Sequence, residues 1–173
     1  GYVLIYNPEF YWNSPVRILY LWEGGMSFHG GFLGVVLGAL YYSIRNKKSI
    51  LSMGDIIATS TPPGLFFGRL ANFTNQELWG KPTTYFLGVE FTKPPANICP
   101  KTWEFESCIR HPSQLYEALL EGLILGILLL ILVYIFNFLK SPGRIMGIFF
   151  LGYSSARIFV EIFREADPQY VST

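Results

Sequence analysis

The stretch SQLYEALLEGLILGILLLILVYIFNFL, residues 113 to 139, decides the fold class. Its apolar run is long enough to cross a lipid bilayer, which takes about 20 mostly apolar residues. Two carboxylates, Glu117 and Glu121, stand near its start, and Tyr116 and Gln114 add further polar groups. A carboxylate inside a membrane span needs a partner. An arginine from another helix would serve Glu121.

The composition of the chain agrees with a membrane protein. Of its 173 residues, 51% are hydrophobic, 17% are aromatic and only 14% are charged, whereas soluble domains carry about 25% charged residues. The net charge of +1 gives no basic field for nucleic acid. We therefore expect an all-α polytopic membrane protein, and no nucleic-acid partner.

Three further stretches are long enough to span a membrane, which gives about four transmembrane helices: residues 27–44, 54–73, 113–139 and 143–163. The second holds Pro62 and Pro63, so a broken helix is expected there. Residues 1–26 are aromatic and interrupted, and are predicted to be an interfacial segment.

The connections predict the orientation. Residues 45–49 and 140–144 are short and basic, which places them on the cytoplasmic side. The long connection, residues 80–112, then forms a loop on the outer face. With this topology the polar residues within the spans gather in the outer leaflet, which indicates one shared cavity.

The fourth span carries a polar stripe. Tyr153, Arg157, Glu161 and Arg164 follow at helical spacing. Arg157 and Glu161 can form an ion pair, which would be either a lock between helices or part of a site. A guanidinium in the outer leaflet also suits a phosphate, because it can bind two oxygens at once.

The end of the second span offers a matching group. Arg69 lies at the corresponding depth, and Asn72, Gln76 or Asn75, and Glu77 follow it. These residues either cap an interfacial helix end or line the same cavity. Two arginines fit a phospholipid head group, and they would also fit a soluble anion in a carrier or channel.

The first predicted span begins with a histidine. His29 stands in MSFHGG, and Gly30, Gly34 and Gly38 repeat every four residues, a pattern that lets helices pack closely. Imidazole suits proton transfer near neutral pH, although a lone histidine is more often only a hydrogen-bonding residue. Cys99 and Cys108 have no zinc spacing, and a disulfide between them stays open.

Four motifs connect these features with one family. GRLANFTNQELWG (68–80) closely resembles the signature of the prolipoprotein diacylglyceryl transferases, and GGMSFHGGFLG, RHPSQLYEALLEG and YSSARIFVEIFRE agree in order and spacing. Thr74 and Lys81 depart from the usual pattern. Family members have seven transmembrane helices, so the chain resembles a central fragment. The first helices, with a functional tyrosine, and the last helix are expected to be missing.

The resemblance implies a bacterial inner-membrane enzyme, multi-pass, with its active site toward the periplasm. It would move the diacylglyceryl group of phosphatidylglycerol onto the lipobox cysteine of a preprolipoprotein, without metal or cofactor. The implied catalytic residues are His29, Arg69, Glu77 and Arg157. The implied substrate-binding residues are Arg69, Asn72, Gly80, Tyr153, Arg157, Glu161, Gly30 and Gly31.

These expectations assign roles as well as residues. Arg69 and Arg157 would hold the phosphate, His29 would be the base, and Glu77 and Glu161 would orient the arginines, with Glu161 pairing Arg157. An anion carrier would show polar residues near the membrane midplane and a second broken helix. A purely structural scaffold would leave the arginines without a task.

Overall fold

The computed structural model describes residues 28–93 and 108–165. These ranges are mostly helical, as predicted. The chain divides into two compact units, Gly1–Met53 and Gly54–Thr173. The predicted interfacial segment 1–26, and residues 94–107 of the predicted outer loop, lie outside the described residues.

The described part of the first unit contains α2 (Phe28–Arg45), close to the predicted range 27–44. The basic turn after it folds back on the helix end, because Lys48 donates its backbone N–H to the carbonyl of Ser43 over 2.9 Å. Lys47 adopts a left-handed conformation there, with φ 51°. The close packing predicted from the glycines of α2 stays a prediction.

Helix α3 (Ile50–Asn75) corrects one expectation, because it continues through Pro62 and Pro63 without a break. The hydroxyls of Thr59 and Thr61 donate to the carbonyls of Asp55 and Ile57 over 2.8 Å each. These bonds do not replace the ones that the prolines remove, which would have ended on the carbonyls of Ala58 and Thr59. Prolines are tolerated inside apolar helices where neighbouring helices pack against them. Pro62 is buried. The missing break also removes a feature that an anion carrier would be expected to show.

The decisive stretch forms one helical rod made of α4 (Ser113–Glu117), η4 (Ala118–Ile124) and α5 (Leu125–Tyr134). The middle segment, η4, is π-helical. Among the described residues, Ser113–Tyr134 is the one helix long and apolar enough to cross a membrane. The predicted range ran to residue 139, but Asn137 takes a left-handed conformation and a short 3-10 turn, η5 (Phe138–Lys140), follows.

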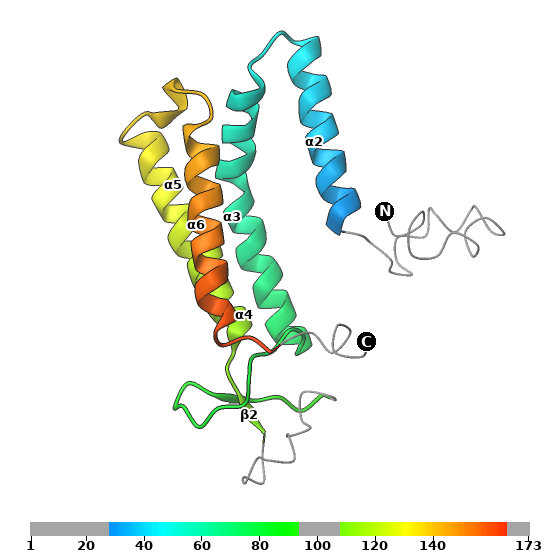
Figure 1. Ribbon diagram of the computed structural model, residues 1–173, viewed down its shortest axis with the longest axis vertical. Coiled ribbons are helices and arrows are strands. Elements are labelled where there is room, and N and C mark those ends of the chain that lie inside the picture. The colour runs from blue at the N-terminus through cyan, green and yellow to red at the C-terminus, as the bar shows by residue number, and fades with distance from the viewer. Residues whose placement is uncertain (1–27, 94–107, 166–173) are drawn as a thin grey trace, which may run out of the picture. The chain divides into compact units, whose positions relative to one another are not determined.

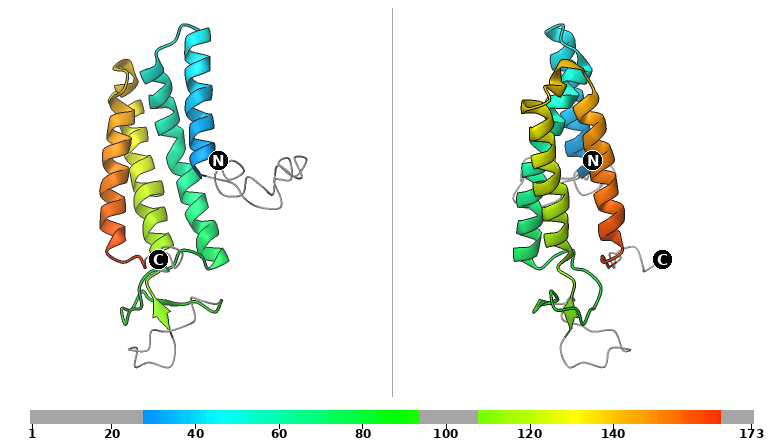
Figure 2. Two further views of the ribbon diagram at one scale, coloured as in Figure 1. Left: turned by 45° about the vertical axis from the view of Figure 1, so that its right-hand side comes forward. Right: turned by 90° about the vertical axis from the view of Figure 1, so that its left-hand side faces the viewer.

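Helix α6 (Arg144–Glu161) returns alongside this rod, and α3 completes the group (Figures 1 and 2). The apolar core contains Ala58, Leu125, Leu129 and Ile145, all buried. It lies toward the end of the bundle where α6 begins. The opposite end, where α3 and α6 finish, carries the polar groups.

The part of the predicted outer loop that the structure describes is tied to this polar end. It contains a short antiparallel pair, β1 (Val89–Glu90) and β2 (Ile109–Arg110). Two isolated bridges, Gly80 with Arg164 and Pro82 with Arg110, join the loop to the chain after α6 and to β2. The strands are an addition to the expected all-helical class.

Candidate active site

The signature stretch turns sharply where α3 ends. Gln76 adopts a left-handed conformation with φ 58°, and Glu77 donates its backbone N–H to the carbonyl of Asn72 over 2.9 Å. This is a helix C-terminus closed by its own backbone. The Gln76 side chain then accepts the N–H groups of Thr92 and Lys93 at 2.9 and 2.8 Å. The turn therefore binds the outer loop to the end of α3.

Gly80 lies in a contact that only glycine can make. Its N–H donates to the carbonyl of His111 over 2.9 Å. A Cβ at this position would come within 2.6 Å of the carbonyl oxygens of both His111 and Phe163. Three segments of the chain meet at this point: the one that follows α3, the one that precedes α4 and the one that follows α6. The contact accounts for Gly80 by packing, and its role in substrate binding stays a prediction.

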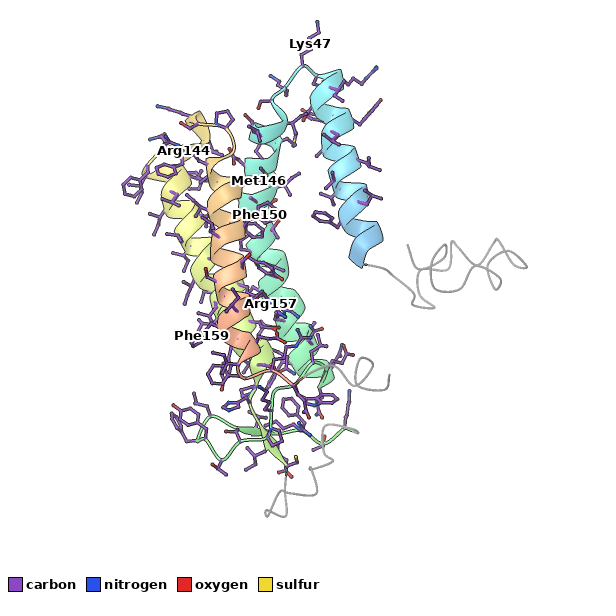
Figure 3. The ribbon with its side chains drawn as sticks, viewed as in Figure 1. Lys47, Arg144, Met146, Phe150, Arg157 and Phe159 are labelled. Atoms are coloured by element: carbon purple, nitrogen blue, oxygen red, sulfur yellow. The ribbon has the colours of Figure 1, made fainter. Side chains whose placement is uncertain are left out.

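Two arginines from separate helices meet one turn inside this junction. Arg69 of α3 places Nε 2.9 Å from Oε2 of Glu117. Arg157 of α6 donates from Nη1 to Oε1 of the same carboxylate. Figure 3 shows Arg157 toward the lower end of α6. Each carboxylate oxygen of Glu117 therefore faces a different arginine.

Glu121 lies behind this first bridge. Its Oε2 is 3.7 Å from Nη2 of Arg69, and its Oε1 is 3.6 Å from Nη1 of Arg157. The prediction that Glu121 needs an arginine from another helix is therefore confirmed, with two arginines instead of one. We call Arg69, Glu117, Glu121 and Arg157 the charge cluster.

The carboxylates of the charge cluster are buried deeper than its arginines. The side chains of Glu117 and Glu121 are 1% and 0% exposed, whereas those of Arg69 and Arg157 are 17% and 23% exposed. Both oxygens of Glu117 lie within bonding distance of a guanidinium, whereas the two oxygens of Glu121 lie 3.6 and 3.7 Å from the nearest guanidinium nitrogens, beyond hydrogen-bond distance. Buried carboxylates are rarely left so incompletely bonded. The two guanidinium groups thus retain a face toward the surface.

The predicted stripe on α6 is only partly realised. Arg157 contacts Glu161 at 3.4 Å, as expected, but Glu161 is 61% exposed, and the buried Glu117 is the closer partner. Tyr153 stacks on Phe149, with ring centroids 5.9 Å apart. Because α6 ends at Glu161, Arg164 leaves the stripe and joins the bridge to Gly80.

Asn72 and Glu77 reach the junction through their backbones. The carbonyl of Asn72 closes the end of α3, and the carbonyl of Glu77 accepts the side-chain amide of Gln114 over 2.5 Å. Gln114 is fully buried. The predicted contacts of the Asn72 and Glu77 side chains with a substrate stay predictions.

His29, Gly30 and Gly31 belong to the other unit of the chain. They lie in the first turn of α2, which agrees with a position at the mouth of the predicted span. The side chain of His29 is outside the described part of the structure, as is Cys99. The catalytic role of His29 and the question of a disulfide therefore stay open predictions.

The second histidine has a structural partner. His111 Nδ1 lies 3.2 Å from the hydroxyl of Tyr116, and its ring packs edge-on against Phe163 at 5.2 Å. Burial lowers the pKa of His111, which keeps the ring neutral at physiological pH. His111 thus stabilises the polar end of the bundle, beside the Gly80 contact.

No group of His, Cys, Asp or Glu among the described residues could hold a metal ion. The expectation that the reaction uses neither metal nor cofactor stays a prediction. The charge cluster itself suits another ligand. Two guanidinium groups that already hold carboxylate oxygens can hold the oxygens of a phosphate in the same way.

Sequence reasoning noticed Glu117 without including it among the site residues. Its signal is the spacing of Glu117 and Glu121, one helical turn apart at the start of a strongly apolar run. Two carboxylates on one buried face require cations from outside their own helix. The sequence interpretation applied that requirement to Glu121 alone, with one arginine, whereas Glu117 is the residue that joins Arg69 and Arg157.

Comparison with known proteins gives the class and then the family. The family model described as prolipoprotein diacylglyceryl transferase matches residues 1–173. The chain belongs to this family, which is membrane-associated. The expected family membership is thereby confirmed.

Individual relatives carry a more specific name. The chain is 49% identical over 172 residues to the phosphatidylglycerol–prolipoprotein diacylglyceryl transferase of Cereibacter sphaeroides and 51% identical to that of Ruegeria pomeroyi. It is 47% identical over 169 residues to that of Rickettsia bellii. Each alignment covers 98–99% of this chain but only 58–60% of the relative. The chain therefore spans less than two thirds of these relatives.

Proposed function

We propose that the protein of which this chain forms a part transfers the diacylglyceryl group of phosphatidylglycerol to the lipobox cysteine of a preprolipoprotein. The name of its relatives supports this reaction and both substrates. The observation that carries the proposal is the meeting of Arg69 and Arg157 on one carboxylate. They come from helices far apart in the sequence, and a lipid phosphate offers the same kind of anionic oxygens.

The proposed reaction is one displacement at a glyceryl carbon. The thiol of the lipobox cysteine loses its proton to a base, and the thiolate attacks the glyceryl carbon that carries the phosphate ester. A carbon–sulfur bond forms while the carbon–oxygen bond breaks, and glycerol phosphate leaves with the electron pair. Arg69 and Arg157 stabilise the charge that grows on the leaving phosphate.

The remaining roles complete the proposed site. Glu117 and Glu121 hold the two guanidinium groups at one depth before the lipid arrives. Asn72 and Tyr153 contact the head group, with Gly30, Gly31 and Gly80 beside it. Glu77 and Glu161 orient the arginines. His29 takes the proton from the thiol.

The exposed faces of the helices support a membrane location. Large apolar side chains of α5 and α6 lie on the surface, among them Tyr134, Leu151 and Ile158, which are 77%, 73% and 73% exposed. A soluble protein rarely exposes so much apolar surface. We propose four membrane crossings, at α2, α3, Ser113–Tyr134 and α6, in the bacterial inner membrane. The charge cluster then faces the periplasm, because the basic turns face the cytoplasm.

The test uses the full-length protein, phosphatidylglycerol vesicles and a lipobox peptide, with transfer read from the mass added to the peptide. Arg157→Ala should lower the transfer rate by about 10³-fold, because a phosphate contact is lost. Arg157→Lys is the matched variant. This variant keeps the charge but loses the planar guanidinium that binds two oxygens at once. Its transfer rate should fall about tenfold less than that of Arg157→Ala. A rate near wild type for correctly inserted Arg157→Ala contradicts the proposal.

The role of His29 has its own test. His29→Gln should slow transfer by about 10²-fold, which is a typical contribution of one general base. Its affinity for phosphatidylglycerol should not change. Binding is measured separately from transfer, with vesicles and no peptide. If the affinity falls as far as the rate, His29 is a contact of the head group and the base lies elsewhere.

A further inference from the structure

A second buried carboxylate lies at the opposite end of the bundle from the charge cluster. Asp55 of α3 is 0% exposed. Its Oδ2 accepts the backbone N–H of Gly143 over 2.7 Å, and its Oδ1 accepts that of Met146 over 2.8 Å. Gly143 and Met146 flank the first turn of α6. A carboxylate from one helix thus caps the N-terminus of another, where unbonded N–H groups and the helix dipole both favour a negative charge.

The surrounding packing makes this contact close. A Cβ at Gly54, the residue before Asp55, would lie 2.6 Å from the sulfur of Met146. The side chain of Met146 therefore packs directly on the backbone of α3 at Gly54. Gly143 supplies the turn before α6 in a left-handed conformation, with φ 89°, which glycine adopts without strain.

The contact at Asp55 lies at the same distance along the chain from each of the two arginines. Arg69 follows Asp55 by 14 residues, and Arg157 follows Gly143 by 14 residues. The two helices run in the same direction, and an α-helix rises about 1.5 Å per residue, so each arginine lies about 21 Å from the capped turn. A fixed contact at Asp55 thus brings Arg69 and Arg157 to the same depth.

We propose that Asp55 is a positioning residue, which sets the register of α3 against α6 so that Arg69 and Arg157 can share one anion. Its influence on catalysis rests on the proposed function, whereas its influence on register does not. The cap then holds α3 against α6 at one end of the bundle, and the charge cluster holds them together at the other. Figure 3 labels Met146 and Arg157 toward the two ends of α6.

The experiment measures register and activity in the same full-length variants. Spin labels are placed at Phe67→Cys on α3 and Ile158→Cys on α6, whose side chains are 67% and 73% exposed. Other accessible cysteines are replaced by serine. The distance distribution between the labels is recorded by pulsed electron paramagnetic resonance for wild type, Asp55→Asn and Asp55→Ala.

The matched control is Ser155→Ala. This change removes a hydroxyl bond of 2.8 Å within α6, to the carbonyl of Leu151, at an exposed position. Both Asp55 variants should broaden or shift the distance distribution, and Ser155→Ala should not. Transfer should fall by about 10²-fold in Asp55→Ala, since a misplacement of about 1 Å can cost that much. Asp55→Asn should lose less, because its amide oxygen keeps one of the two bonds.

Asp55→Asn has nearly the same volume as the native residue, so it decides the question where Asp55→Ala does not fold. An unchanged distance distribution in Asp55→Asn overturns the proposal, whether or not transfer falls. A wild-type protein that transfers no diacylglyceryl group contradicts the proposed function instead. The label distances still test the register in that case.

Discussion

The two ends of the bundle hold buried carboxylates in different ways. Asp55 is bonded to backbone N–H groups at both oxygens, with distances of 2.7 and 2.8 Å. Glu117 and Glu121 face arginine side chains instead; both oxygens of Glu117 are within bonding distance of a guanidinium, but those of Glu121 are 3.6 and 3.7 Å away. One end is bonded to the backbone. The other end is bonded to side chains, and its deeper carboxylate is bonded only loosely.

This difference separates a structural contact from a site. Backbone N–H groups cannot turn away, so the cap at Asp55 stays fixed. Arginine side chains can exchange one anion for another, so the charge cluster can accept a phosphate. Leaving buried carboxylate oxygens without donors costs stability. The fold offsets that cost elsewhere, and the cap and the apolar core beside it are the obvious sources.

The largest loss of stability at the end with the charge cluster should come from Glu117→Gln. Glu117 is almost fully buried and contacts both arginines. Removing one partner of a buried ion pair costs about 3 kcal/mol or more, because the remaining charges lose their compensation. Because the relatives are longer than this chain and the entropy of unfolding grows with length, we expect the thermal unfolding midpoint of the full-length protein to fall by about 5 °C. The midpoint is measured in detergent on the full-length protein.

Glu161→Gln is the matched control for that change. Glu161 contacts the same arginine at 3.4 Å but is 61% exposed. Exposed ion pairs contribute about 0–1 kcal/mol, so its midpoint should fall by about 2 °C or less. Equal losses in the two variants would show that burial does not distinguish these carboxylates. The buried bridge at Glu117 would then be no stronger than the exposed pair at Glu161, although both contact Arg157.

Much of the fold could be predicted from the sequence, because apolar length is a strong signal. The helices at residues 28–45, 113–134 and 144–161 lie close to the predicted ranges. The continuity of α3 was predicted wrongly. Proline disfavours helix in water, but here Pro62 is buried inside one continuous helix and packs beside Gly126 of the neighbouring rod. That outcome depends on neighbours which a local pattern does not contain.

The sequence predicted the arginines of the site better than the carboxylates that bind them. Arg69 and Arg157 were expected to meet, and the structure brings them together. Glu161 was expected to be the main partner of Arg157, because helical spacing shows only residues on the same helix. Glu117 and Asp55 act across helices. Their partners are set by tertiary register, which the sequence of one helix does not reveal.

A smaller loss of stability should come from changing a helix–helix contact midway between the two ends of the bundle. Gly122 of η4 packs on the backbone of α3, where a Cβ would lie 2.7 Å from the Cα and 2.9 Å from the N of Phe66. Gly122→Ala should force η4 and α3 apart at Phe66, about one helical turn before Arg69. Overpacking of this kind costs about 1–3 kcal/mol. The midpoint of the full-length protein should fall by about 2–5 °C, with a parallel loss of transfer, because Arg69 moves away from Glu117.

Gly126→Ala is the control, since it lies one turn further along the same helical rod. A Cβ there would be 3.1 Å from the side chain of Pro62 and would meet no backbone atom within 4 Å. Alanine also favours helix over glycine by about 1 kcal/mol. We therefore expect Gly126→Ala to keep or raise the midpoint while Gly122→Ala lowers it. If both variants behave alike, the contact at Phe66 does not hold α3 in place, and the cap at Asp55 must set the depth of Arg69 without its help.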